Sequence, residues 1–87
     1  FKVYPNPSEA NLHVDFTVLS GKQVSFCILD MTGRLVWASD MHVIPGQAQR
    51  WTWDGKMANG METAAGMYLL RMKSGSEVKT TRIVRSR

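Results

Sequence analysis

The residues best suited to catalysis or metal binding are few and widely spaced. His13 and His42 are the only histidines. Neither has a carboxylate or hydroxyl residue at a spacing that would build a catalytic triad or a metal-ligand set. The single cysteine, Cys27, lies in an apolar stretch, without a cationic neighbour in sequence that would activate its thiol. No Cys or His spacing is typical of zinc, so we predict no catalytic residue, metal or cofactor.

A second candidate is the oxygen-bearing loop that contains Asp54, Asn59 and Glu62. The loop reads Asp-Gly-Lys-Met-Ala-Asn and lacks the alternating oxygen ligands of a calcium-binding loop. Asp54 followed by Gly55 is instead typical of a turn in which the carboxylate accepts a hydrogen bond from its own backbone. We therefore predict a structural role for this loop.

Trp51 and Trp53 fall on one face of an extended segment and allow two interpretations. They could stack against a sugar as a glycan-binding platform. A chain of 87 residues, however, needs large apolar side chains in its interior. We therefore favour the core for at least one of the pair.

Positive charge is concentrated at the C-terminal end. Residues 1–70 hold five Lys and Arg against six Asp and Glu, whereas residues 71–87 hold six basic residues against Glu77 alone. The charge could protect an edge strand from unwanted pairing, bind a polyanion such as lipopolysaccharide, or dock onto a receptor. Aromatic residues are not interleaved with these charges, which argues against nucleic-acid binding.

The elements that must position these residues are short strands. The chain length suits one domain, and Gly and Pro interrupt every run long enough for a helix. No apolar run approaches the length of a membrane-spanning helix. The first residues do not have the basic-then-apolar pattern of a leader peptide, which we expect ahead of Phe1 in a longer protein. Alternating apolar residues predict an all-β antiparallel sandwich of about seven strands, in the segments 2–4, 11–18, 24–29, 35–44, 51–53, 66–73 and 77–85.

Turn signals separate these segments. Pro5-Asn6-Pro7 ends the first strand, either as the entry of an edge segment or as a rigid linker junction. The run from Asp30 to Arg34 predicts a tight hairpin in which Gly33 takes a positive φ.

These motifs, in their order along nearly the whole chain, resemble the C-terminal sorting domains of the type IX (Por) secretion system. The resemblance rests on Tyr-Pro-Asn-Pro at 4–7, Asp30 with Gly33-Arg34, Trp53-Asp54-Gly55, Asn59-Gly60, Gly66-x-Tyr68, Gly75, and Arg82 before Ile83-Val84. Arg82 stands where the family commonly has Lys, which keeps the charge and changes the hydrogen-bond geometry. Such domains are immunoglobulin-like, carry no catalysis and are read by a transport machine.

The resemblance implies a function and a set of partners. Residues 1–87 are expected to form a single sorting domain and the last module of a longer protein. That protein is expected to cross the periplasm of a Gram-negative bacterium and reach the cell surface or medium. The implied partners are the outer-membrane shuttle or translocon, a sortase-like peptidase and anionic lipopolysaccharide. The residues expected on or beside the recognised surface are Gly66, Tyr68, Lys79, Arg82 and Arg85.

Two alternatives remain open from the sequence. One is a generic immunoglobulin-like structural module, similar to the domain of flagellar hook-capping proteins, which shares the Trp-Asp-Gly, Asn-Gly and Gly-x-Tyr pattern. The other is an adhesion or glycan-binding module that uses Trp51 or Trp53. The sequence also leaves open whether the domain is cleaved from its parent protein or retained.

Overall fold

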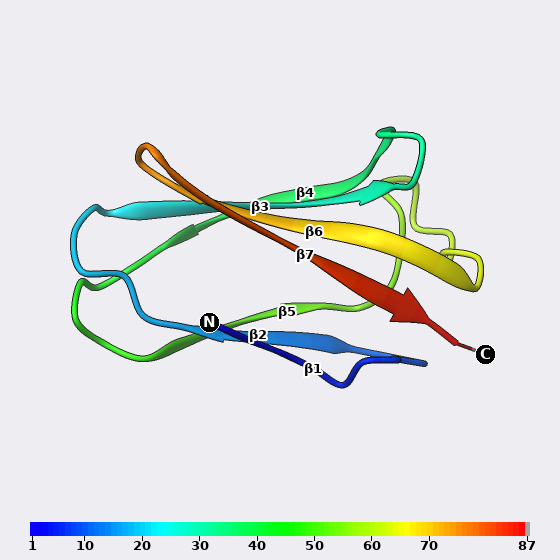
Figure 1. The fold of residues 1–87 in the computed structure, drawn as a ribbon, viewed down its shortest axis with the longest axis horizontal. Helices are drawn as coiled ribbons and strands as arrows, with labels where there is room; N and C mark the ends of the chain where they lie inside the picture. The colour runs from blue at the N-terminus through cyan, green and yellow to red at the C-terminus, as the bar shows by residue number, and fades with distance from the viewer. Residues whose placement is uncertain (87) are drawn as a thin grey trace.

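Two antiparallel sheets pack face to face in the computed structural model, which describes residues 1–86 (Figure 1). One sheet has the order β1-β2-β5, and the other has the order β4-β3-β6-β7. The strands are β1 (Lys2–Tyr4), β2 (Leu12–Phe16), β3 (Gln23–Asp30), β4 (Leu35–His42), β5 (Gln49–Trp53), β6 (Gly66–Ser74) and β7 (Glu77–Arg85). The predicted immunoglobulin-like sandwich of seven strands is confirmed.

The core fills the space between the two sheets. Strict alternation turns Leu12, Val14 and Phe16 of β2 inward, toward the inward-facing residues of β3. Trp51 and Trp53 are 6% and 1% exposed, and the Trp51 ring stacks on Phe26 with centroids 4.4 Å apart. Both tryptophans therefore belong to the core. The glycan-stacking platform is wrong because neither ring is available at the surface.

The predicted turns have the expected local chemistry. Gly33 takes a φ of 89° in the β3–β4 hairpin. Asp30 Oδ1 accepts hydrogen bonds from the backbone N–H groups of Thr32 and Arg34, both at 2.9 Å. In the connection after β5, Asp54 Oδ1 accepts from the Lys56 N–H at 3.0 Å. Asp54 thus stabilises turn backbone, as predicted, and Asp30 does the same in the predicted hairpin.

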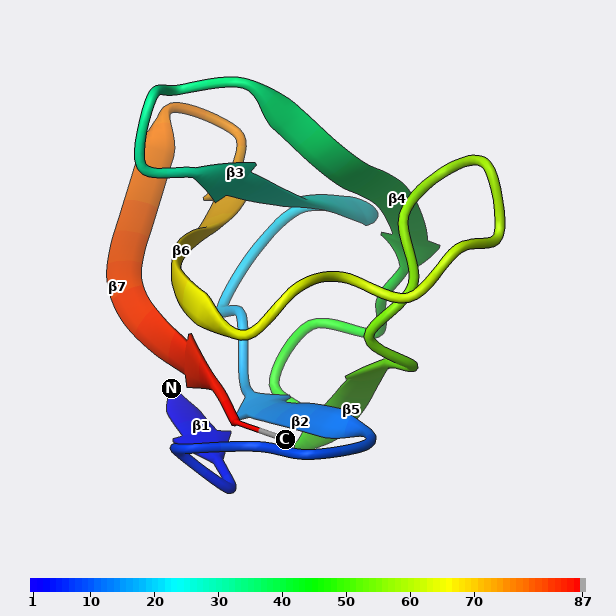
Figure 2. The same ribbon diagram turned by 90° about the vertical axis from the view of Figure 1, so that its right-hand side faces the viewer.

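The connection from β5 to β6 passes from one sheet to the other (Figure 2). It spans residues 54–65 and is joined to β4 by a hydrogen bond from Ala58 N–H to the Val36 carbonyl, 3.2 Å. β4 is continuous from Leu35 to His42 and ends two residues before the predicted segment 35–44 does. None of the described residues forms a helix of the length and hydropathy needed to cross a membrane.

β7 is an edge strand of the four-stranded sheet. It pairs with β6 through an uninterrupted register from Ser74–Glu77 to Gly66–Arg85. Thr81, Ile83 and Arg85 face the other sheet, and Ile83 is fully buried. The outer edge of β7 is the feature on which the candidate site is built.

Candidate recognition site on the final strand

Arg85, expected at the surface, lies inside the domain and is only 4% exposed. Its Nε donates to Thr63 Oγ1 at 3.2 Å, and its Nη1 donates to Ser8 Oγ at 3.1 Å and to the Ala10 carbonyl. The expectation that this side chain belongs to an exposed recognition surface is therefore not met by its position. Thr81 and Ile83 point inward, and residues two apart in a strand share a face, so Arg85 points inward as well.

The cradle of Arg85 is formed by two loops that are distant from each other in sequence, together with Trp53 of β5. Ser8 and Ala10 come from the loop after β1, and Thr63 comes from the β5–β6 connection. The guanidinium also lies over the Trp53 ring, 5.1 Å from its centroid. Gly55 completes the cradle, because a Cβ at that position would overlap the guanidinium. Arg85 thus holds the end of β7 against both sheets and two loops.

The segment Asn6–Ser8 covers the outer edge of β7 near its end. Val84 N–H donates to Asn6 Oδ1 at 2.9 Å, and the Asn6 amide donates to the Arg82 carbonyl at 3.3 Å. Beyond them, Ser8 N–H donates to the Val84 carbonyl at 2.9 Å, and Ser86 N–H donates to the Ser8 carbonyl at 2.8 Å. We call Asn6–Ser8 the edge clasp. The peptide bonds that precede the prolines on either side of Asn6, Tyr4-Pro5 and Asn6-Pro7, are both cis.

The edge clasp explains the Pro5-Asn6-Pro7 motif better than a linker junction does. Pro5 and Pro7 have no N–H to offer a neighbouring strand. The Asn6 side chain supplies one donor and one acceptor in their place, directed at β7. The motif therefore caps the outer edge of β7 in addition to ending β1.

Gly66 and Tyr68 lie at the start of β6, beside the end of β7. Gly66 pairs with Arg85 and has a φ of 147°, and Tyr68 pairs with Ile83. Tyr68 is 8% exposed, and its hydroxyl donates to the Ala64 carbonyl at 2.7 Å. Gly66 is exposed, whereas Tyr68 packs in the core, so the predicted Gly-x-Tyr pair presents mainly backbone at the surface.

Lys79 and Arg82 are exposed on β7, as expected, but on opposite faces of the sheet. Lys79 lies across from Met72, and its Nζ is 5.7 Å from the centroid of the Phe1 ring. Arg82 lies across from Leu69 on the outer face. The structure therefore places these two cations on opposite faces of the same edge strand, apart from the buried Arg85.

The outer face of the four-stranded sheet mixes basic and apolar side chains. Arg71 lies between Cys27 and Thr80, while Leu69 lies between Leu29 and Arg82. Cys27 is half-buried on this face beside Arg71, although the sequence suggested a packed side chain with no cationic neighbour. Exposed apolar residues nearby include Leu35 and Met67.

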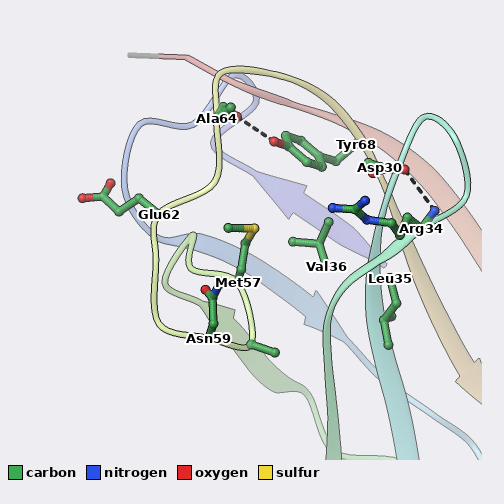
Figure 3. A pocket seen from close by; sticks show the side chains of 10 residues that line it. Asp30, Arg34, Leu35, Val36, Met57, Asn59, Glu62, Ala64 and Tyr68 are labelled. Atoms are coloured by element: carbon green, nitrogen blue, oxygen red, sulfur yellow. Dashed lines mark hydrogen bonds between the residues drawn. The ribbon is translucent and has the colours of Figure 1, made fainter.

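A groove separates the β3–β4 hairpin from the β5–β6 connection (Figure 3). Its walls include Val36, Met57 and Tyr68, with Arg34 at the hairpin side, and Glu62 points away to solvent. The Asp30 carboxylate at the hairpin accepts a hydrogen bond from the Thr32 hydroxyl at 2.6 Å. That bond, together with those from the Arg34 and Thr32 backbone, lowers the pKa of Asp30 below its usual 3.8.

A polar cluster also joins β1, β2 and β5 on the outside of the smaller sheet. Arg50 Nε donates to Asp15 Oδ1 at 2.8 Å, and the Tyr4 hydroxyl donates to Asp15 Oδ2 at 2.8 Å. The hydrogen bond from Arg50, followed by that from Tyr4, lowers the pKa of Asp15. The bond to Asp15 raises the pKa of Tyr4. These hydrogen bonds tie the three strands of the smaller sheet together on its outer face.

Sequence reasoning missed three participants in the β7 site: Ser8, Ala10 and Thr63. Their polar atoms contact Arg85 only after the chain has folded, and nothing in their local sequence marks them. The one available signal was the alternation in β7 itself, which places Arg85 on the same side as Ile83.

The family model described as "Secretion system C-terminal sorting domain" matches residues 2–86. A comparison with curated protein sequences gives no match. Among solved structures, the chain is similar to dimeric latent PorU from Porphyromonas gingivalis, with a TM-score of 0.80 and 22% identity. It is also similar to PorZ, an essential surface component of the type-IX secretion system of the same organism, with a TM-score of 0.73 and 24% identity.

A third similar structure is FlgD of Xanthomonas campestris, a protein of flagellar hook capping, with a TM-score of 0.70 and 21% identity. The match covers 91% of this chain and 58% of the FlgD chain. For PorU and PorZ it covers 97% and 99% of this chain but only 9% and 11% of theirs. The structural likenesses establish the immunoglobulin-like fold, and the chain corresponds to a small part of PorU and PorZ.

Proposed function

Because this chain belongs to the family of secretion system C-terminal sorting domains, we propose that it is a folded address label for the type IX secretion system. The label directs the protein that carries it across the outer membrane and to the cell surface or medium. The observation that carries the proposal is the extent of the family match, which includes all seven strands. A match over the whole sandwich supports recognition of a folded domain.

Within that label, β7 is the element best placed to be recognised. It is an edge strand, and its Lys79 and Arg82 side chains are exposed. Gly66 lies exposed beside its end, while Tyr68 and Arg85 hold β6 and β7 in place from inside. We assign Lys79, Arg82 and Gly66 to the contact surface, and Tyr68 and Arg85 to its support.

The partners that follow are those of a secreted protein in a Gram-negative bacterium. The domain meets an outer-membrane shuttle or translocon after transit through the periplasm. A sortase-like peptidase then acts on the junction ahead of the domain and joins the parent protein to anionic lipopolysaccharide. We assign no reaction, cofactor or nucleic acid to the domain itself.

A generic structural module is the second candidate, and the likeness to FlgD is the observation that favours it. The two functions differ in what happens to an attached protein. A sorting label moves an unrelated protein to the cell surface, whereas a structural module leaves it where its leader peptide delivers it.

The test is a fusion of a periplasmic reporter ahead of Phe1, expressed in a bacterium that has the type IX system. We expect the reporter on the surface or in the medium with residues 1–87 attached, and in the periplasm when the chain is truncated after Val78. A truncated fusion that still reaches the surface would refute the proposal. An intact fusion that stays in the periplasm would favour the structural module.

A further inference from the structure

The outer edge of β7 is closed over one half and open over the other. The edge clasp binds the backbone from Arg82 to Ser86 through its four hydrogen bonds. Among residues 1–86, no hydrogen bond reaches the outer side of the strand before the Arg82 carbonyl. The open half runs from Val78 to Arg82.

The register with β6 determines which backbone groups the open half presents. Arg82, Val84 and Ser86 direct N–H or C=O groups to the edge clasp and away from β6. Antiparallel pairs alternate between bonded and non-bonded residues with a period of two, and no bulge interrupts this register. Val78 and Thr80 therefore also direct their N–H and C=O groups outward, as does the N–H of Arg82.

We propose that this open half binds an extended acidic segment of the partner protein, which adds to the sheet as a further strand. The inference rests on the proposed function, because the partner is the protein that reads the sorting label. Strand addition uses backbone hydrogen bonds for affinity and side chains for selectivity. Here the backbone of Val78, Thr80 and Arg82 provides the hydrogen bonds.

The charges beside the open half specify the chemistry of the added strand. Lys79 and Arg82 are three residues apart, and successive side chains of a strand alternate between its faces. One cation therefore lies on each face of the sheet. A strand with two carboxylates three residues apart places one beside each cation, and opposite charges in neighbouring strands attract.

A second copy of this chain fits the open half poorly. In an antiparallel pair of β7 strands centred on Thr80, Val78 of one copy lies opposite Arg82 of the other, and Lys79 lies opposite Thr81. Glu77, the only acidic residue of β7, then reaches Ile83, where the edge clasp already covers the strand. This pairing brings four cations together without a carboxylate opposite any of them. A pairing centred on Val78 instead places Glu77 opposite Lys79, but the turn at Gly75 and Ser76 then faces the rest of the open half. An acidic strand therefore fits the open half better than a second copy does.

The first test uses a synthetic peptide as the probe, acetyl-Thr-Glu-Val-Thr-Glu-Val-Thr-amide, titrated into the intact 87-residue chain. Amide chemical shifts in nitrogen-labelled protein report the binding position. We expect the largest shifts at Val78, Thr80 and Arg82. A matched peptide with Gln in place of both Glu residues should bind about fivefold more weakly.

Three outcomes of the peptide titration would overturn the inference. The Glu and Gln peptides could bind equally tightly. The chemical-shift changes could be concentrated in the groove beside Met57. The chain alone could form a concentration-dependent dimer through β7. Binding of anionic lipid vesicles at Arg71 and Arg82, with no response to the peptide, would also contradict it.

The second test removes one outward backbone donor. Thr80→Pro deletes the central N–H of the open half, and an edge strand tolerates proline where the N–H faces solvent. We expect Thr80→Pro to weaken peptide binding by at least about tenfold. Thr80→Val, which keeps the N–H and the β-branched shape, should bind like the unchanged chain. Equal binding by both variants would refute strand addition.

A charge exchange keeps the inference testable should Thr80→Pro unfold the domain. The double variant Lys79→Glu and Arg82→Glu should no longer bind the peptide with two Glu residues. It should instead bind a matched peptide in which Lys replaces both Glu residues. Failure of this exchange in a folded variant would contradict the assignment.

The reporter fusion separates this inference from the proposed function. If the folded Thr80→Pro fusion is exported normally while truncation after Val78 abolishes export, strand addition is wrong and the sorting function stands. If the truncated fusion is also exported, the proposed function fails as well.

Discussion

The guanidinium of Arg85 lies over the ring of Trp53, 5.1 Å from its centroid, and joins the last strand of one sheet to the last strand of the other. Its hydrogen bonds reach Ser8, Ala10 and Thr63. A basic residue near the end of the chain thus holds the sandwich closed, although the local charge suggests a surface role.

Replacement of Arg85 should destabilise the domain strongly. Arg85→Met keeps much of the volume but leaves the oxygen atoms of the buried Ser8 and Thr63, and the carbonyl of Ala10, without their donor. We expect a loss of about 2 to 3 kcal/mol in the free energy of unfolding, because unsatisfied buried polar groups keep their desolvation cost. Urea unfolding measures it. The exposed Arg82→Met is the matched control and should change stability by less than about 0.5 kcal/mol. Equal effects of the two variants would refute the structural role of Arg85.

Gly55→Ala should be more harmful than Gly33→Ala. Both glycines have positive φ, 83° and 89°, so both substitutions strain the backbone. Only at Gly55 does the new methyl group overlap the Arg85 guanidinium, whereas the space around Gly33 is open. We expect Gly33→Ala to cost about 1 kcal/mol and Gly55→Ala distinctly more.

A double-mutant cycle identifies the cause of that difference. If the overlap with Arg85 is responsible, the cost of Gly55→Ala should shrink when Arg85 is already Met. Additive effects on the free energy of unfolding would show that the methyl group and the guanidinium do not interact.

Removal of the Asn6 side chain should open the end of β7 locally. Asn6→Ala deletes the acceptor of the Val84 N–H and the donor to the Arg82 carbonyl. The Val84 amide should then exchange with solvent faster, and stability should fall by about 1 kcal/mol. Asn11→Ala, in an exposed loop position, is the control. Unchanged exchange at Val84 in Asn6→Ala would mean that the edge clasp contributes nothing.

Because the pKa of Asp30 is lowered, we expect the free energy of unfolding to depend on pH in the acid range. Its pKa is lower in the folded chain than the usual 3.8, so the unfolded chain binds the proton more readily. The ionised Asp30 carboxylate stabilises the fold above about pH 4, and this contribution disappears as the pH falls through the pKa that Asp30 has in the folded chain. Asp30→Ala should therefore be less stable than the unchanged chain at pH 7, and the difference should narrow at pH 2 to 3. A difference that widens on acidification would have the wrong sign.

Strand positions were predictable because alternation is a local property of the sequence. β2 follows from apolar residues two apart, β7 follows from its many β-branched residues after the turn at Gly75, and the other turns follow from Asp30, Gly33 and Asp54. The same alternation places Arg85 inward. Charge composition, taken alone, led to the opposite expectation for that residue.

The edge clasp and the cradle of Arg85 were not predictable from local pattern. Asn6 binds Val84 across a sequence separation of 78 residues, through a side chain that has no periodic signature. Thr63 and Ser8 are polar residues in loops, where polar residues are ordinary. Only the packing of the two sheets shows that they surround one guanidinium.

The central claim is that the folded domain is a sorting label read at the exposed part of β7. Its most direct test is the surface fraction of a reporter fused to the Lys79→Glu and Arg82→Glu double variant, measured alongside the melting temperature of the isolated domain. The account predicts that the melting temperature changes little while the reporter remains in the periplasm. Normal surface delivery by this folded variant would contradict it.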